Sequence, residues 1–368
     1  MLNKSFRILI LGSGGREHAF AWKLSQSRHV ENITVIPGNG GTSLGLPKVS
    51  NFTLELSNFT EIVLFAKSKE VNLVVPSSEG PLVAGITDAF LKAGIACFGP
   101  TKAAAILEGS KVFSKSFMRR HNIPTAEFEV FDSFPQAKAY IEAIQYPIVI
   151  KASGLAAGKG VLMPNNKEDA ISCLEDMMVK KVFGSAGDQV VIEERLEGDE
   201  ISVAICSDGW DIKMFPAGQD HQRVFAGNVG PNTGGMGCYA PTPLCSDSQL
   251  HDIYSRILLP TIDGMREEGT PFVGMICIGV IMTSSGPKNL EYNVRFGDPE
   301  AQILFPLLTE DSDLALIISA CTEKRLAEVT MNFKQKFAAN VVLCSVAIRQ
   351  CMIPVIPLRS DISCWYDI

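Results

Sequence analysis

Three features are missing from this sequence, and each absence argues against a class of protein. No apolar run approaches the roughly 20 residues of a membrane span, and the run at residues 8–11 is too short for a signal-peptide core. The ten cysteines include no Cys-x-x-Cys pair, so neither a zinc site nor a dithiol redox motif is indicated. An excess of positive charge is also missing: the formal net charge is −7, which disfavours nucleic acid and anionic membranes as partners.

The rest of the composition is that of an ordinary globular protein. The 368 residues are 46% hydrophobic and 20% charged, which is enough for two or three domains with sizeable cores. Scattered, unpaired cysteines are typical of a reducing compartment, so we expect a cytoplasmic protein.

A glycine-rich turn, Gly12-Ser-Gly-Gly15, follows the first predicted strand at 7–11 and precedes a helical pattern at 16–27. Free backbone N–H groups at a helix N-terminus form an anion site. The dinucleotide fingerprint, however, requires a glycine where Glu17 stands, and the second strand, 32–36, ends without an acid for a ribose. The loop therefore predicts a phosphate or small-anion site, and a tight turn that serves only helix packing is the alternative.

Strands predicted at 71–75 and 95–98, with a helix at 81–92 between them, continue the alternation of strand and helix. This alternation predicts a doubly wound parallel sheet in the first hundred residues. Ligands of such sheets bind at the carboxyl ends of the strands, so the loops 12–15, 37–41 and 76–81 should line one cleft.

A second glycine-rich segment, Lys151 to Gly160, joins predicted strands at 148–151 and 160–163. It is not a Walker A motif, because no Ser or Thr follows Lys159 at a helix start. A hairpin of this composition can fold over a triphosphate, and a mobile surface hairpin is the alternative. We also predict a helix at 101–120 with Lys111 near its middle.

Further along the chain, the strand predicted at 190–194 ends in two acids. Such an end suits a linker that meets an adenine and a ribose, and a surface turn is the alternative. A lone His221 is more often a satisfied loop histidine than a catalyst, and no Ser or Cys stands in a recognisable nucleophile context.

The apolar run at 274–282 predicts a strand that pairs with a second strand at 290–296. Residues 290–296 alternate, so this second strand should have two different faces. Glu291, Asn293 and Arg295 share one face, and the residues between them are apolar. Carboxylate and amide oxygens suit Mg²⁺ shared with phosphates, and arginine suits phosphate or carboxylate. Asp298 followed by proline predicts a capped helix start. The alternative is a solvated strand face that leads into a helix.

Together these motifs resemble the ATP-grasp fold and, within it, the phosphoribosylamine–glycine ligase (glycinamide ribonucleotide synthetase) family. The resemblance is carried, in unbroken order, by residues 12–18, 37–42, 109–111, 151–160, 219–221, 230–237 and 293–300. It implies an α/β, ATP-grasp architecture: an N-terminal substrate-binding domain at 1–107 with a doubly wound parallel sheet, and an ATP-grasp domain at 108–330. The lid subdomain is expected at about 125–194, and 331–368 as the remnant of an incomplete C-terminal domain.

The resemblance also implies a reaction and a set of site residues. ATP, 5-phosphoribosylamine and glycine would yield ADP, phosphate and glycinamide ribonucleotide through glycyl phosphate, in de novo purine biosynthesis. The implied catalytic residues are Lys151, Asp220 and Arg295, and the ligands of Mg²⁺ or Mn²⁺ are Glu291 and Asn293. The implied ATP contacts are Lys111, Lys151, Ser153, Gly154, Gly158, Lys159, Gly160, Glu193, Glu194 and Glu200. The implied substrate contacts are Gly14, Gly15, Asn39, Glu79, Asp220, Arg295 and Gly297.

Two departures from the family pattern leave alternatives open. The turn at 76–82 differs from that of the family although Glu79 is retained, and the match stops near Val346. There are two alternatives. One is another ATP-grasp ligase that acts on a different carboxylate, and the other is a truncated nucleotide-binding form with little or no turnover. In each case we expect small-molecule ligands, and neither nucleic acid nor membrane as a partner.

Overall fold

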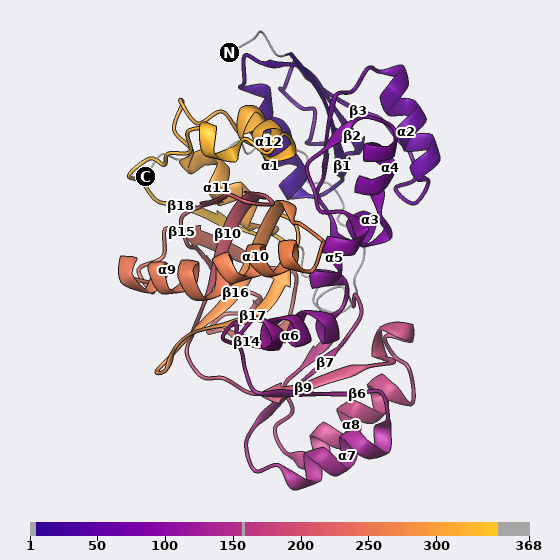
Figure 1. Ribbon diagram of the computed structural model, residues 1–368, viewed down its shortest axis with the longest axis vertical. Helices are drawn as coiled ribbons and strands as arrows, with labels where there is room; N and C mark the ends of the chain where they lie inside the picture. The colour runs from indigo at the N-terminus through magenta and orange to yellow at the C-terminus, as the bar shows by residue number, and fades with distance from the viewer. Residues whose placement is uncertain (1–4, 157–158, 345–368) are drawn as a thin grey trace.

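The N-terminal region of this computed structural model, which describes residues 5–156 and 159–344, is built on a five-stranded parallel sheet of order β3-β2-β1-β4-β5 (Figure 1). Its strands are β1 (Phe6–Gly12), β2 (Val30–Pro37), β3 (Val49–Asn51), β4 (Leu73–Pro76) and β5 (Ala96–Cys97). Successive side chains of β1 are buried on both faces, as in a parallel sheet covered by helices on each side. The sequence did not predict β3.

Helices cover both faces of this sheet. On one face α1 (Gly15–Ser25) shares an apolar core with α11 (Glu300–Leu307) and α12 (Leu314–Thr322), which come from the far end of the described chain. On the other face lie α2 (Phe59–Ser68), α3 (Glu79–Ala84) and α4 (Ile86–Lys92). The predicted doubly wound sheet is therefore confirmed.

Two helices that the sequence predicted as continuous are each divided in two. Gly85, at φ +100°, ends α3 and precedes α4. The helix predicted at 101–120 is α5 (Lys102–Gly109) and α6 (Lys111–Arg120), because Ser110 is extended and its Oγ accepts the N–H of Phe113. Lys111 is thus the first residue of α6 and not, as predicted, near the middle of one long helix.

A four-stranded antiparallel sheet of order β11-β10-β16-β17 occupies the centre of the molecule. Its strands are β10 (Asp199–Asp208), β11 (Ile212–Met214), β16 (Val273–Thr283) and β17 (Gly286–Asn293). The predicted pairing of β16 with β17 is confirmed, with a bulge where Gly279 pairs with Glu291 and Val280 with Asn289. One face packs against α6, α9 (Asp247–Ile253), the π-turn Tyr254–Leu258 and α10 (Leu259–Glu267).

The end of β17 corrects two details of the sequence prediction. The strand stops at Asn293, so Arg295 lies in the bend that follows and not on the strand itself. The helix α11 begins at Glu300, and Asp298 does not cap it: its Oδ1 accepts a hydrogen bond from the side-chain amide Nε2 of Gln302 at 2.6 Å and none from the backbone of the helix. The alternation of burial nevertheless continues through Phe296, which is buried.

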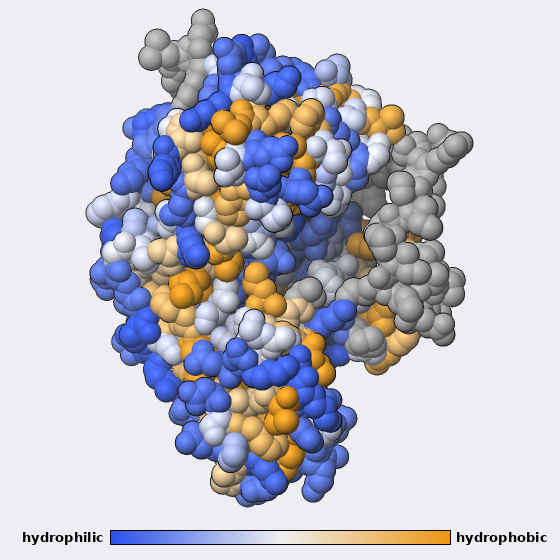
Figure 2. Space-filling model, turned by 90° about the vertical axis from the view of Figure 1, so that its right-hand side faces the viewer, coloured by the Kyte–Doolittle hydropathy of each residue, from blue (hydrophilic) through white to orange (hydrophobic). Residues whose placement is uncertain are grey.

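The segment expected to be the lid, at about 125–194 and hereafter called the lid, forms a separate lobe, seen at the bottom of Figure 1 and as a narrow projection below the body in Figure 2. Its antiparallel sheet, of order β6-β9-β7-β8, consists of β6 (Phe128–Phe131), β7 (Ile148–Ala152), β8 (Val161–Leu162) and β9 (Val190–Glu194). Helices α7 (Phe134–Ala143) and α8 (Lys167–Met178) pack on one face and give the lobe its own apolar core. The 3-10 turn Gly184–Gly187 precedes β9. The predicted strands at 148–151 and 190–194 and the return strand after Gly160 are confirmed.

Two small sheets complete the described structure. The strands β12 (Gln219–Asp220), β15 (Gly237–Ala240) and β18 (Ala338–Val341) form one, and β13 (Arg223–Phe225) and β14 (Val229–Asn232) the other. A 3-10 turn, Leu326–Glu328, lies before β18. The expectation of a divergent tail from Val346 falls on residues 346–368, outside the described part. None of the helices between residues 5 and 344 has the length and hydropathy that a bilayer span requires.

Candidate active site

An ion pair joins the start of α6 to the end of β17. Lys111 Nζ lies 2.9 Å from Glu291 Oε2. The Lys111 ammonium, against the opposing effect of burial, holds the pKa of Glu291 at about 2. Burial alone would lower the pKa of Lys111, but the surrounding carboxylates, chiefly Glu291, together raise that pKa. Both groups are therefore charged at neutral pH, and the structure brings together one residue predicted to bind phosphate and one predicted to bind metal.

Arg295 is enclosed by acidic and amide oxygens. Its Nη2 donates to Glu108 Oε1 at 2.9 Å and to Asn293 Oδ1 at 3.1 Å, and its Nε lies 3.3 Å from Glu79 Oε2. Burial alone would lower the pKa of Arg295, but the carboxylates of Glu108 and Glu79 raise it further. Sequence reasoning missed Glu108, whose signal was an acid directly before the Gly-Ser-Lys segment at 109–111.

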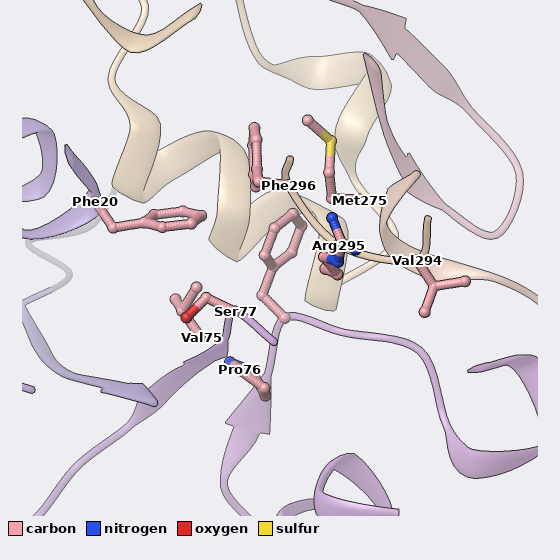
Figure 3. Close-up of a pocket in the computed structure, with 9 residues that line it drawn as sticks. Phe20, Val75, Pro76, Ser77, Met275, Val294, Arg295 and Phe296 are labelled. Carbon is pink, nitrogen blue, oxygen red and sulfur yellow. The ribbon is translucent and has the colours of Figure 1, made fainter. Parts of the chain in front are cut away.

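A small, mostly apolar cavity of about 10 Å³ lies against Arg295 (Figure 3). Its wall includes Phe20 of α1, Val75 of β4 and Phe296. Apolar walls exclude water, so the electrostatic interactions of the guanidinium on this side are less screened than at a free surface.

Glu291 and Asn293 have the donor chemistry of a magnesium site. Both oxygens are hard ligands on one face of β17, and each group keeps lone pairs beyond its hydrogen bond to Lys111 or Arg295. Within residues 5–156 and 159–344 no three His, Cys, Asp or Glu side chains are grouped so that they could enclose a metal. Two protein ligands fit an ion that takes its remaining ligands from phosphates and water, as Mg²⁺ does.

The carboxylate of Glu193 is buried between two lysines. Lys151 Nζ lies 2.5 Å from Glu193 Oε1, and Lys115 Nζ lies 2.6 Å from Glu193 Oε2. The Glu193 side chain is 2% exposed, so its carboxylate is engaged here and is not presented to a ribose as the sequence suggested. Burial lowers the pKa of Lys115 to about 8 despite Glu193. Sequence reasoning missed Lys115, whose signal was its position four residues after Lys111 in a helical pattern.

The base of the lid hairpin is tied to α6. The carbonyl of Ser153 accepts the N–H of Lys111 at 2.8 Å, and its Oγ lies 3.1 Å from Ser110 Oγ. Gly154 approaches Ala186 so closely that a Cβ would lie 2.9 Å from it. Gly160 accepts the N–H of Ala152 across the hairpin. Gly158 lies outside the described residues.

A polar cavity of about 390 Å³ borders the outer edge of the hairpin. Three cationic residues line it, Lys159, Arg195 and Arg223, and Val161 of β8 forms part of its wall. Of the two other acids predicted at the nucleotide end, Glu194 lies 3.8 Å from Lys288, and Glu200 is exposed at the start of β10.

The N-terminus of α1 faces carboxylates. The N–H of Gly14 donates to Glu17, and the N–H of Arg16 lies 3.4 Å from Asp298 Oδ2. A Cβ on Gly15 would lie 2.9 Å from Gln302 Nε2. The predicted substrate residue Asn39 is also engaged, since its side chain donates to Ser13 O and accepts the N–H of Gly41.

Asp220 and Glu300 form a second acidic group, since their carboxylates interact electrostatically. Burial, and next the Glu300 carboxylate, raise the pKa of Asp220 to about 7. Asp220 Oδ1 is buried and has no hydrogen-bond partner among the described residues. Burial also raises the pKa of Glu300. The predicted substrate residue Gly297 packs against Glu300, and a Cβ at this position would overlap that carboxylate.

Sequence comparison matches most of the chain to one family. Residues 6–108 match the N domain of phosphoribosylglycinamide synthetase, and residues 109–301 match the ATP-grasp (A) domain of the same enzyme. The bifunctional purine biosynthetic protein of Schizosaccharomyces pombe is 51% identical over 91% of this chain and 42% of its own length. Phosphoribosylamine–glycine ligase of Vibrio parahaemolyticus is 43% identical over 92% of this chain and 78% of its own.

Comparison with solved structures points to the same family. The crystal structure of phosphoribosylamine–glycine ligase from Thermotoga maritima is similar, with a TM-score of 0.76, 32% identity, and coverage of 91% of this chain and 79% of that one. The biotin carboxylase domain of a 2-oxoglutarate carboxylase from Hydrogenobacter thermophilus, at 18% identity and a TM-score of 0.70, shares the fold alone. The chain spans about two fifths of the length of the first curated relatives it matches. These matches, together with the convergence of Lys111, Glu291, Asn293 and Arg295, show that the chain belongs to the phosphoribosylglycinamide synthetase family of ATP-grasp proteins.

Proposed function

We propose that this chain ligates glycine to 5-phosphoribosylamine at the expense of ATP, giving glycinamide ribonucleotide, ADP and phosphate in de novo purine biosynthesis. The contact of Lys111 with Glu291 carries the proposal, because it unites a phosphate-binding cation and a metal ligand at the foot of the lid. The proposal is supported by the family and by relatives named phosphoribosylamine–glycine ligase.

The first step is phosphoryl transfer. A carboxylate oxygen of glycine attacks the γ-phosphorus of ATP, the bond to the bridging oxygen of ADP breaks, and glycyl phosphate forms. Lys111 and Lys151 bind the phosphate oxygens and offset their negative charge. Mg²⁺ held by Glu291 and Asn293 would add Lewis-acid stabilisation of the same charge. The lid hairpin over the phosphates excludes water from the acyl phosphate.

The second step is acyl transfer. The amine nitrogen of phosphoribosylamine attacks the acyl carbon, phosphate leaves, and the nitrogen loses a proton. Arg295 lies where it can bind a carboxylate or phosphate oxygen, and Asp220, with its unpartnered Oδ1, suits a substrate amino group. No side-chain nucleophile takes part, since the acyl group is activated as a phosphate and not as a protein ester.

The remaining assignments are part of the same proposal. We assign 1–107 to substrate binding and 108–330 to the ATP-grasp domain, with the lid at about 125–194. We propose Mg²⁺ over Mn²⁺ as the physiological ion, because it commonly accompanies nucleotide phosphates. Small molecules are the proposed partners, nucleic acid is not among them, and the cytoplasm is the proposed compartment.

The test measures phosphate release from MgATP by the full chain with freshly generated phosphoribosylamine, with and without glycine. We expect release only when both acceptors are present, and formation of glycinamide ribonucleotide in equal amount. Phosphate release that does not depend on glycine or on phosphoribosylamine, or that requires a different amino acid, would refute the substrate assignment. Repeating the assay with Mn²⁺ tests the choice of metal.

A further inference from the structure

A buried cluster of two lysines around one carboxylate lies beside the proposed nucleotide site. Glu193 contacts Lys151 and Lys115 through its two oxygens, and none of the three side chains is more than 6% exposed. We propose that Lys115 is a positioning residue for nucleotide binding: it offsets the charge of Glu193, so that the cluster around Lys151 keeps a net positive charge for the phosphates of ATP. The inference rests on the ATP-dependent function proposed above.

The charges of the cluster show why Lys115 matters. Two ammonium groups and one carboxylate sum to +1. Without Lys115, Glu193 and Lys151 would form a neutral pair, because two opposite charges 2.5 Å apart in a buried site interact strongly. The other predicted phosphate-binding lysine, Lys111, is itself paired with Glu291. The net positive charge of these five side chains therefore depends on Lys115.

Lys115 acts through Glu193, because its own side chain is turned away from solvent. It is 1% exposed and lies within α6. Its Nζ donates to Thr125 Oγ1 at 2.6 Å, and that hydroxyl donates to the carbonyl of Asn289 at 2.7 Å. With 1% of its side chain exposed and its ammonium held by Glu193 and Thr125, Lys115 presents almost no surface that a ligand could contact.

The same cluster fixes the direction of Lys151. Its Nζ donates to the carbonyl of Leu290 at 3.2 Å, directly before Glu291 on β17. The lid lysine is thus held against the strand that carries the proposed metal ligands. Burial lowers the pKa of Lys115 only to about 8, so that the lysine keeps its proton at neutral pH.

A purely structural ion cluster is the alternative explanation, and the two differ in how they respond to charge. Lys115→Met leaves a neutral Glu193–Lys151 pair. The double variant Lys115→Met/Glu193→Gln restores a net charge of +1 without restoring any ion pair. The charge mechanism predicts that the double variant regains ATP binding, whereas a structural role predicts that it does not.

The experiment measures dissociation constants of the full chain for MgATP and for adenosine, which has no phosphates. Lys115→Met should bind MgATP roughly tenfold more weakly, and adenosine as wild type does, since one unit charge near the phosphates is removed. The double variant should return to about threefold of wild type for MgATP, by the same charge argument. The matched control is Lys138→Met, which removes an exposed lid lysine 3.8 Å from Glu142 and should change neither constant.

Each outcome either supports or overturns the charge mechanism. Equal MgATP affinity in Lys115→Met and wild type, or equal losses for MgATP and adenosine, would overturn the inference. If the single variant does not fold, the double variant provides the comparison, and a loss of more than about tenfold for MgATP refutes the charge mechanism. Wild type that binds MgATP but forms no glycinamide ribonucleotide would contradict the proposed reaction and leave this inference standing. Wild type that binds no nucleotide would overturn both.

Discussion

Replacing Glu291 with glutamine removes one charge from its ion pair with Lys111 and keeps the shape of the side chain. The pKa of Glu291 falls from 4.5 to about 2, a difference of 4.5 − 2 = 2.5. At about 1.36 kcal/mol per pKa unit this corresponds to roughly 3.4 kcal/mol. A third of the side chain is exposed, and solvent screening reduces the value by about half. We therefore expect Glu291→Gln to lower the free energy of unfolding of the ligand-free protein by about 1–2 kcal/mol at pH 7.

The same substitution should have a larger effect once nucleotide is present. Wild type at about 100 times its dissociation constant for MgATP should gain about 2.7 kcal/mol. Glu291→Gln should lose most of this gain, and its phosphate release should fall by about 100-fold or more, because a proposed metal ligand is weakened. Thermal unfolding with and without MgATP, and phosphate release with both acceptors, provide the two measurements.

The pH dependence of the free energy of unfolding gives an independent check on the size of the Glu291 contribution. Because the pKa of folded Glu291 is depressed, its contribution to stability is present above about pH 4.5 and is lost as the pH falls toward 2. The difference between variant and wild type should therefore shrink in acid. Glu142→Gln, which removes an exposed carboxylate 3.8 Å from Lys138, should change stability by less than about 0.5 kcal/mol. Normal phosphate release by Glu291→Gln, or an unchanged stabilisation by MgATP, would refute the reasoning.

Three further predictions concern neighbouring residues. Lys151→Ala should reduce the MgATP-induced rise in melting temperature, and an unchanged rise would argue against a phosphate contact. Gly297→Ala should slow phosphate release at least about tenfold, because a Cβ there displaces Glu300; Gly80→Ala, which meets open space, is its control. Stability in urea should decline as the pH rises from about 4 to 7, because the pKa of folded Asp220 is raised to about 7, and Asp220→Asn should flatten that decline.

Strand positions were predictable from the sequence where apolar runs were uninterrupted. The runs at 7–11, 190–194 and 274–282 indicate β1, β9 and β16, since burial on both faces leaves little choice of residue. Helix breaks were harder to predict. The division at Ser110 depends on the N–H of Phe113, which donates to Ser110 Oγ. Serine is found inside helices as well as at their ends, and only the tertiary contact of Ser110 with Ser153 distinguishes the two positions here.

In the candidate site, too, local patterns were predictable from the sequence and tertiary contacts were not. The spacing of Glu291 and Asn293 on one strand face is a local property, so it was visible in the sequence. The partners of Arg295 were not, because Glu79 and Glu108 lie far away in the chain and meet it only through the fold. The burial of Glu193 was also hidden, since a strand that ends in acids reads the same whether those acids face water or two lysines.

The two cores that flank the site differ in how they connect to the rest of the chain. Phe20 of α1 packs against Phe296 and Phe305, with ring centres 5.0 and 4.8 Å apart, so the N-terminal sheet and the segment after Asn293 share one apolar core. The lid has a core of its own. Local opening of the lid therefore leaves the main core intact, whereas opening around Phe20 disturbs the residue next to Arg295. Thermal fluctuations should thus reach the proposed nucleotide side of the site at a lower free energy than the proposed substrate side, so that the two sides differ in rigidity before any ligand arrives.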